Sequence, residues 1–115
     1  MITKSKYGNK KVSRLVNGET VMFDSKKEAR HYDRLYLELK AGLISELTLQ
    51  PKYDLIPTTK WNGKTLRKIT YNADFRYSKN GKTYVEDVKG MLTDVYKIKM
   101  RLFVQQNPNI IFKEV

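Results

Sequence analysis

Residues 71–90 read Tyr-Asn-Ala-Asp-Phe-Arg-Tyr-Ser-Lys-Asn-Gly-Lys-Thr-Tyr-Val-Glu-Asp-Val-Lys-Gly, and this stretch decides the fold. Two β-rich runs flank a central Asn-Gly pair, which is typical of a two-residue β-hairpin turn. If Lys79 and Lys82 close that turn, the register places Asp74 opposite Asp87. Like charges at directly opposed positions destabilise a hairpin, so the sequence either tolerates this cost or supplies a cation.

The same register decides which acids share a face. Lys89 follows Asp87 by two residues, and alternate residues of a strand point to one side. Glu86 therefore points to the opposite face. We expect Asp74, Asp87 and Lys89 to gather on one patch of the hairpin.

The length and composition predict one small domain. The chain has 115 residues, so we expect a basic arm over residues 1–11 and a single domain over residues 12–115. Cysteine is absent, which excludes disulfides, zinc-thiolate sites and thiol catalysis. No run approaches the ~18 apolar residues of a membrane span, so we expect a cytoplasmic protein without a membrane partner.

The charge predicts a polyanionic partner. Twenty-three Lys and Arg against 12 Asp and Glu give a net charge of +11, spread along the chain. DNA, RNA or an anionic membrane fits such a surface, although some small basic domains bind no nucleic acid. Lys99 lies between two apolar arcs of its helix, so its amine either extends to solvent, which we favour, or points at the same site as Lys89. The candidate contacts are Lys10, Lys11, Lys27, Arg30, Lys97 and Lys99.

Apolar periodicity and turn residues predict the remaining elements. A helix between the last two strands is a crossover, so that pair of strands should be parallel. The short final strand is apolar and suits the interior of a sheet. The predicted elements are a hairpin over 12–16 and 19–23, a helix over 25–41, a strand over 44–56 interrupted near Gln50-Pro51, a long strand over 67–77, a helix from 93 or 94 to 106, and a strand over 110–112.

Two residues outside the hairpin have alternative interpretations. Glu28 lies on the apolar stripe of the first helix, where it is either a functional carboxylate or part of a capping box with Ser25. Trp61 lies in the turn-rich segment 57–63, predicted as a loop. We favour a Trp61 that covers the core over one that stacks on a base.

The order of these residues resembles the PD-(D/E)XK nuclease superfamily. That family places an acid on the first helix, a Pro-Asp element on one core strand and an acid-x-Lys element on the next. Glu28 matches the first, Ala73-Asp74 the second and Asp87-Val88-Lys89 the third, with Ala73 replacing the proline. The resemblance covers roughly residues 20–112. It implies an α/β (α+β) fold with a restriction-endonuclease-like αβββαβ core, in which two helices flank a central mixed sheet, plus an N-terminal β-hairpin.

More narrowly, the chain is similar to a small phage and prophage family. The residues that carry this resemblance are the Phe-Asp-Ser-Lys-Lys-Glu-Ala start of the first helix, Gln50-Pro51, Asn72-Ala-Asp-Phe and the Val-Lys-Gly after Asp87.

The resemblance implies a Mg²⁺ (or Mn²⁺) site. Asp74, Asp87 and the carbonyl of Val88 would hold the metal through oxygen ligands, and Glu28 would add an indirect or second-metal ligand. Lys89 would orient water or stabilise developing negative charge, with Gln50 as a weaker candidate for positioning. The alternative is that Asp74, Asp87 and Lys89 form a structural ion-pair cluster.

The expected function is therefore metal-dependent DNA endonuclease activity. No separate sequence-reading element is visible, so branched or junction DNA in phage recombination or replication is the expected substrate. The location would be the bacterial host cytoplasm, and resolvases of this superfamily suggest a homodimer by analogy. One alternative is a non-catalytic nucleic-acid-binding phage protein that retains the fold. Another is a protein-binding phage factor whose basic surface recognises an acidic host protein.

Overall fold

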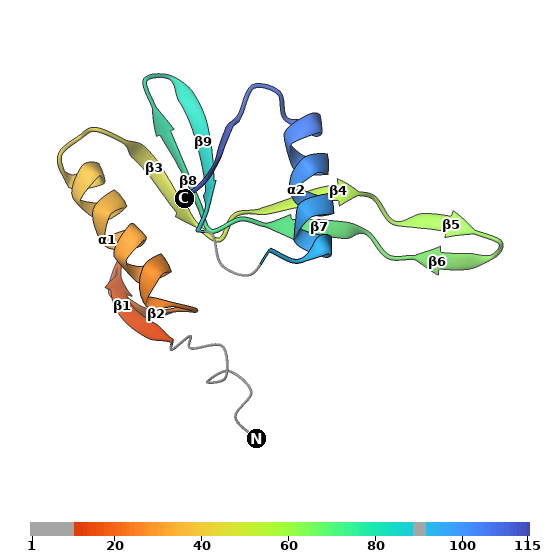
Figure 1. The fold of residues 1–115 in the computed structure, drawn as a ribbon, viewed down its shortest axis with the longest axis horizontal. Coiled ribbons are helices and arrows are strands. Elements are labelled where there is room, and N and C mark those ends of the chain that lie inside the picture. The colour runs from red at the N-terminus through yellow and green to blue at the C-terminus, as the bar shows by residue number, and fades with distance from the viewer. Residues whose placement is uncertain (1–10, 89–91) are drawn as a thin grey trace. The chain divides into compact units, whose positions relative to one another are not determined.

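The computed structural model describes residues 11–88 and 92–115. They belong to two compact units, which divide between residues 43 and 44 (Figure 1). Most of the predicted basic arm, residues 1–10, lies outside the described residues. In chain order the elements are β1 (Val12–Val16), β2 (Glu19–Phe23), α1 (Lys26–Lys40), β3 (Ser45–Leu49), β4 (Lys52–Ile56), β5 (Thr59–Trp61), β6 (Lys64–Leu66), β7 (Ile69–Asn72), β8 (Phe75–Lys79), β9 (Lys82–Asp87), α2 (Asp94–Gln106) and β10 (Ile111–Glu114).

The first unit is a hairpin followed by a helix, as the sequence predicts. Strands β1 and β2 pair antiparallel. The ring of Phe23 stacks on Tyr32 of α1 with centroids 5.3 Å apart. The Arg14 guanidinium donates two hydrogen bonds, of 2.8 and 2.9 Å, to the two carboxylate oxygens of Asp33. An aromatic contact and a bidentate ion pair thus join the hairpin to its helix.

The second unit is built on a mixed four-stranded sheet of order β10-β9-β8-β3. Strands β3, β8 and β9 are antiparallel neighbours, and β10 runs parallel to β9 after the α2 crossover, which confirms the predicted parallel pair. The class is α/β (α+β), and α1, β3, β8, β9, α2 and β10 follow the expected αβββαβ order. Strand β10 is an edge strand, so its predicted interior position is wrong.

Helix α2 covers one face of this unit through Phe103. Phe103 is fully buried among Leu55, Tyr71 and Val85, and its ring centroid lies 4.6 Å from that of Tyr53. Thr93 caps the helix, since its side-chain oxygen accepts a hydrogen bond from the main-chain N–H of the third residue of the helix. Aromatic packing therefore fixes the helix against β4 and β7.

The predicted long strand over residues 67–77 is wrong, because the chain changes partner within it. Strand β7 pairs with β4, whereas β8 pairs with β3 and β9. At the change, the Ala73 amide donates to the Pro51 carbonyl at 3.1 Å, and the Gln50 amide donates to the Asp74 carbonyl at 2.9 Å. Proline has no main-chain N–H to donate to a ladder. The strand pairing is therefore interrupted at Gln50-Pro51, opposite the change of partner at Ala73-Asp74.

The predicted loop over residues 57–63 is also wrong, since it contains a strand. Strands β5 and β6 form a short hairpin around Asn62 and Gly63, whose φ values of 49° and 75° suit a type I′ turn. The β4–β7 ladder and this hairpin run on as one ribbon, away from the four-stranded sheet (Figure 1). Trp61 is 56% exposed, which contradicts its predicted place over the core.

Candidate functional site

The β8–β9 hairpin has the predicted register. Lys79 pairs with Lys82 and Phe75 with Glu86, so the next position in register holds Asp74 and Asp87. The Asp74 amide donates to the Glu86 carbonyl at 3.2 Å, which extends the ladder one residue beyond β8. The two aspartates therefore face each other at the open end of the hairpin.

Asp74 is held in place by the chain that follows β9. The main-chain N–H of Val88 donates to Asp74 Oδ2 at 2.7 Å. An amide donor to a carboxylate favours the ionised form and fixes its orientation. The Asp74 carboxylate therefore lies against the Asp87-Val88 segment that the resemblance assigns to metal binding.

Asp87 is a buried acid in an unusual environment. Its side chain is only 9% exposed, and this burial raises the pKa of the carboxyl group. Hydrogen bonds from the Tyr71 hydroxyl and the Asp74 main chain, and one shared with the Asp74 carboxyl group, act in the opposite direction. Two carboxyl groups in hydrogen-bonding contact need a shared proton or a cation between them. The pair therefore holds either a proton or a cation.

Glu86 and Asp87 point to opposite faces of the sheet, as their alternation predicts. Glu86 is 2% exposed, and its carboxylate accepts a hydrogen bond of 2.6 Å from the Tyr77 hydroxyl. Asp87 instead accepts from Tyr71, on the face that α2 covers. The hairpin thus carries two adjacent buried acids, each bonded to its own tyrosine.

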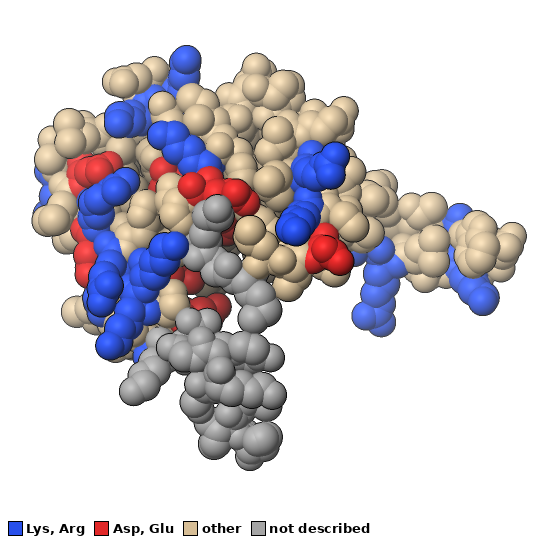
Figure 2. Space-filling model, viewed as in Figure 1, with Lys and Arg blue, Asp and Glu red and all other residues tan. Residues whose placement is uncertain are grey.

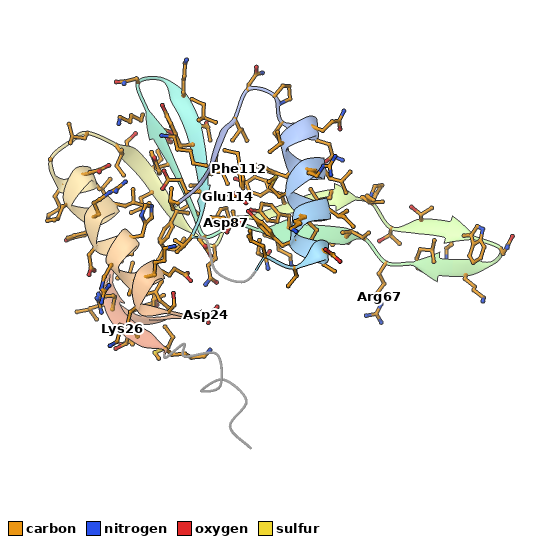
Figure 3. All side chains as sticks on the ribbon, in the orientation of Figure 1. Asp24, Lys26, Arg67, Asp87, Phe112 and Glu114 are labelled. Carbon is orange, nitrogen blue, oxygen red and sulfur yellow. The ribbon has the colours of Figure 1, made fainter. Side chains whose placement is uncertain are left out.

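Three residues that the sequence did not single out adjoin Asp87. Tyr71 is the first, and burial together with its hydrogen bond to Asp87 raises the pKa of its hydroxyl, which therefore stays a donor. Glu114 is the register partner of Asp87 on β10, and the two lie together in Figure 3. The Tyr96 hydroxyl donates to Glu114 at 2.7 Å, and the negative charge of Glu114 raises the pKa of Asp87 further.

Gln50 reaches the site through its main chain. It adopts a left-handed conformation with φ of 50°, and its amide donates to the Asp74 carbonyl. Its side chain is exposed. The structure therefore places Gln50 beside Asp74 and gives its side chain no fixed role.

Of the other predicted site residues, Glu28 belongs to the first unit and Lys89 lies outside the described residues. Glu28 is buried in the first unit, where its amide donates to Ser25 Oγ at 3.1 Å, one of the two hydrogen bonds of the predicted capping box. Among residues 11–88 and 92–115, no three His, Cys, Asp or Glu side chains form a group arranged to hold a metal ion. At the predicted site the structure therefore describes two acids, Asp74 and Asp87, and the Val88 main chain beside them.

The predicted nucleic-acid contacts belong to both units. Lys27 and Arg30 are exposed on α1 and Lys97 is exposed on α2, whereas Lys99 is half-buried. Lys11 lies 3.5 Å from a carboxylate oxygen of Asp24, and Lys10 lies outside the described residues. Figure 2 shows Lys and Arg side chains distributed over the visible face of the molecule.

Comparison with known proteins gives a family over nearly the whole chain. Residues 4–115 match the family described as "Protein of unknown function (DUF1064)". The chain belongs to this family. No curated protein matches the sequence. In the described part of the chain, neither helix has the length and apolar character needed to cross a membrane.

Proposed function

We propose that this protein is a metal-dependent DNA endonuclease of the PD-(D/E)XK type. The observation that carries the proposal is the contact between Asp74 and Asp87, both fixed by neighbouring donors at the open end of one hairpin. Such an arrangement would offer carboxylate oxygens, the ligands that a hard cation prefers. The net charge of +11 supports a phosphate-bearing substrate.

Each residue would have a separate task. Asp74 and Asp87 would hold Mg²⁺ or Mn²⁺ together with the Val88 carbonyl. A bound metal would supply charge stabilisation and a more acidic water molecule. Val88 N–H and Tyr71 would orient the two carboxylates. The roles proposed for Glu28 and Lys89 rest on the sequence resemblance alone.

The proposed substrate is branched or junction DNA, in phage or prophage recombination or replication. This choice, like the homodimer, rests on the resemblance to resolvases of the superfamily. Sedimentation velocity would test the dimer. A single monomer species at the concentrations used for cleavage would contradict it.

The experiment is DNA cleavage by paired variants at adjacent positions. Wild type, Asp87→Asn and Glu86→Gln are incubated with four-way junction, flap and linear duplex DNA, with Mg²⁺ or with EDTA. Both substitutions remove one buried carboxylate of a Tyr–acid pair, but on opposite faces. We expect Mg²⁺-dependent cleavage that Asp87→Asn abolishes and Glu86→Gln retains. Equal cleavage by wild type and Asp87→Asn would show that this site is not catalytic.

A non-catalytic DNA-binding protein is the second candidate. It is favoured by the absence, among residues 11–88 and 92–115, of a third acid or histidine in a metal-holding group with Asp74 and Asp87. Its binding to DNA would not depend on Mg²⁺. Asp74→Ala would leave that binding unchanged or strengthen it, because one source of phosphate repulsion is removed.

A further inference from the structure

The segment over residues 57–68 projects from the second unit as an arm, which we call the β5–β6 arm. Its strands pair Thr59 with Leu66 and Trp61 with Lys64, and every residue over 56–69 is exposed. In Figure 1 the arm continues the β4–β7 ladder beyond the sheet. The arm has no buried side chain, and a two-stranded hairpin is only marginally stable by itself. Its exposed side chains therefore do not serve a core of the arm's own.

The arm is basic throughout. Residues 57–68 carry Lys60, Lys64, Arg67 and Lys68 and no acidic residue. Lys68 lies 3.6 Å from a carboxylate oxygen of Asp54 in β4. Within the described residues, Lys60, Lys64 and Arg67 form no ion pair. Figure 3 shows the Arg67 side chain pointing away from the ribbon, and the visible face of the arm in Figure 2 carries no Asp or Glu beyond its base.

The tip adds an aromatic ring to this charge. Trp61 is the only tryptophan of the chain, and more than half of its surface is exposed, although tryptophan is mostly buried in folded proteins. Trp61 and Lys64 are register partners, so their side chains lie on the same face of the hairpin. An exposed indole beside a cation is suited to contact a base and its phosphate together.

We propose that the β5–β6 arm is a nucleic-acid contact, in which Trp61 stacks on an unpaired base and Lys64, on the same face, binds the adjacent phosphate. Lys60, on the opposite face of the hairpin, and Arg67 bind further phosphates. The proposal rests on the proposed function in its choice of DNA as the polyanion. It deepens that function, because a stacking residue at the end of a basic arm prefers sites where bases are unpaired, as in a flap. Because residues 57–68 include no acidic residue, the arm does not suit contact with a basic protein surface.

The single tryptophan allows a direct test. Full-length Asp87→Asn protein in EDTA, which cannot cleave by the proposed site, is titrated with flap DNA, four-way junction and blunt duplex. Indole emission and fluorescence anisotropy of labelled DNA are followed together. We expect flap DNA to quench Trp61 emission more than blunt duplex does. We expect Trp61→Ala to weaken flap binding by about 5-fold to 150-fold, and Trp61→Phe to weaken it less.

The charge of the arm has a matched control on another hairpin. Lys79 and Lys82 are exposed and flank an Asn-Gly turn as register partners, as Trp61 and Lys64 do in the arm. Lys60→Gln/Lys64→Gln and Lys79→Gln/Lys82→Gln therefore change the net charge equally. We expect the first pair to lower the slope of log affinity against log salt by about 2, and the second to lower it less.

Three outcomes would overturn the proposal. The first is indole emission that no DNA changes. The second is an equal loss of DNA affinity in the two lysine pairs. The third is emission that changes with protein concentration without DNA, which would assign the arm to contact with a second copy. Cleavage that is absent in wild type while Trp61 quenching persists would reject the proposed enzyme and leave the arm intact.

Discussion

The hydroxyl group of Tyr71 provides a sharp test of the site, because the hairpin carries its own control. Tyr71→Phe removes the hydroxyl that donates to Asp87 and keeps the ring, whose centroid lies 5.3 Å from that of Phe103. Tyr77→Phe removes the equivalent donor to Glu86 on the opposite face. Both tyrosines are buried, at 3% and 5% exposure.

The two variants should differ in function and agree in stability. Removing a buried donor to a carboxylate should lower the free energy of unfolding by about 1–3 kcal/mol in each case. At about 4–8 °C per kcal/mol for a small domain, the melting temperature should fall by roughly 5–20 °C. Removing a group that hydrogen-bonds to a metal ligand typically lowers metal affinity or activity by ~10–100-fold. We expect this loss for Tyr71→Phe and not for Tyr77→Phe.

The assay combines thermal melts with the Mg²⁺ concentration that half-saturates cleavage of flap DNA, measured below both melting temperatures. Tyr71→Phe should need more Mg²⁺ than wild type, and Tyr77→Phe should not. Equal Mg²⁺ dependence of the two variants would refute the argument that Tyr71 orients a metal ligand.

Three further predictions concern the fold. Phe103→Ala should lower the free energy of unfolding, measured by urea titration, by about 3–5 kcal/mol, because Phe103 is fully buried. Val104→Ala, at an exposed position of α2, should change it by less than ~0.5 kcal/mol. Equal losses in the two variants would contradict the assigned core. The Arg14 guanidinium lowers the pKa of Asp33 below its ordinary value of 3.8, so the stability that this pair contributes should be complete above that value and lost as pH falls through the lowered pKa. Acid melts in which wild type and Asp33→Asn lose stability in parallel would exclude that contribution. Gly81→Ala should lower the free energy of unfolding by about 1–2 kcal/mol, because Gly81 has a φ of 76°, which strains any residue with a side chain. An added methyl group would meet only open space, so backbone strain is the only cost. An unchanged melting temperature would contradict this.

The parts of the fold that the sequence predicts well are those fixed by local chemistry. Asn80 and Gly81 adopt the positive φ values that a type I′ turn requires, so the turn alone sets the register and places Asp74 opposite Asp87. Capping residues set the helix starts in the same way, at Ser25 and Thr93. Short-range geometry is enough for each of these features.

The parts that the sequence missed depend on pairing between distant segments or on weak local patterns. Asn62-Gly63 has the same turn chemistry, but its strands have three residues each and lie entirely exposed, so no apolar alternation marks them. Glu114 joins the site through the parallel register of β10, which no local signal specifies. Tyr71 reaches Asp87 from β7, across a break in what reads as one continuous strand.

Metal binding at the Asp74–Asp87 pair is the central claim, and Mn²⁺ provides the most direct measurement of it. Electron paramagnetic resonance of free Mn²⁺ is followed while wild type, Asp87→Asn or Glu86→Gln is added without DNA. We predict that wild type and Glu86→Gln bind the ion and that Asp87→Asn does not. Binding of Mn²⁺ by Asp87→Asn with the affinity of wild type would contradict the account.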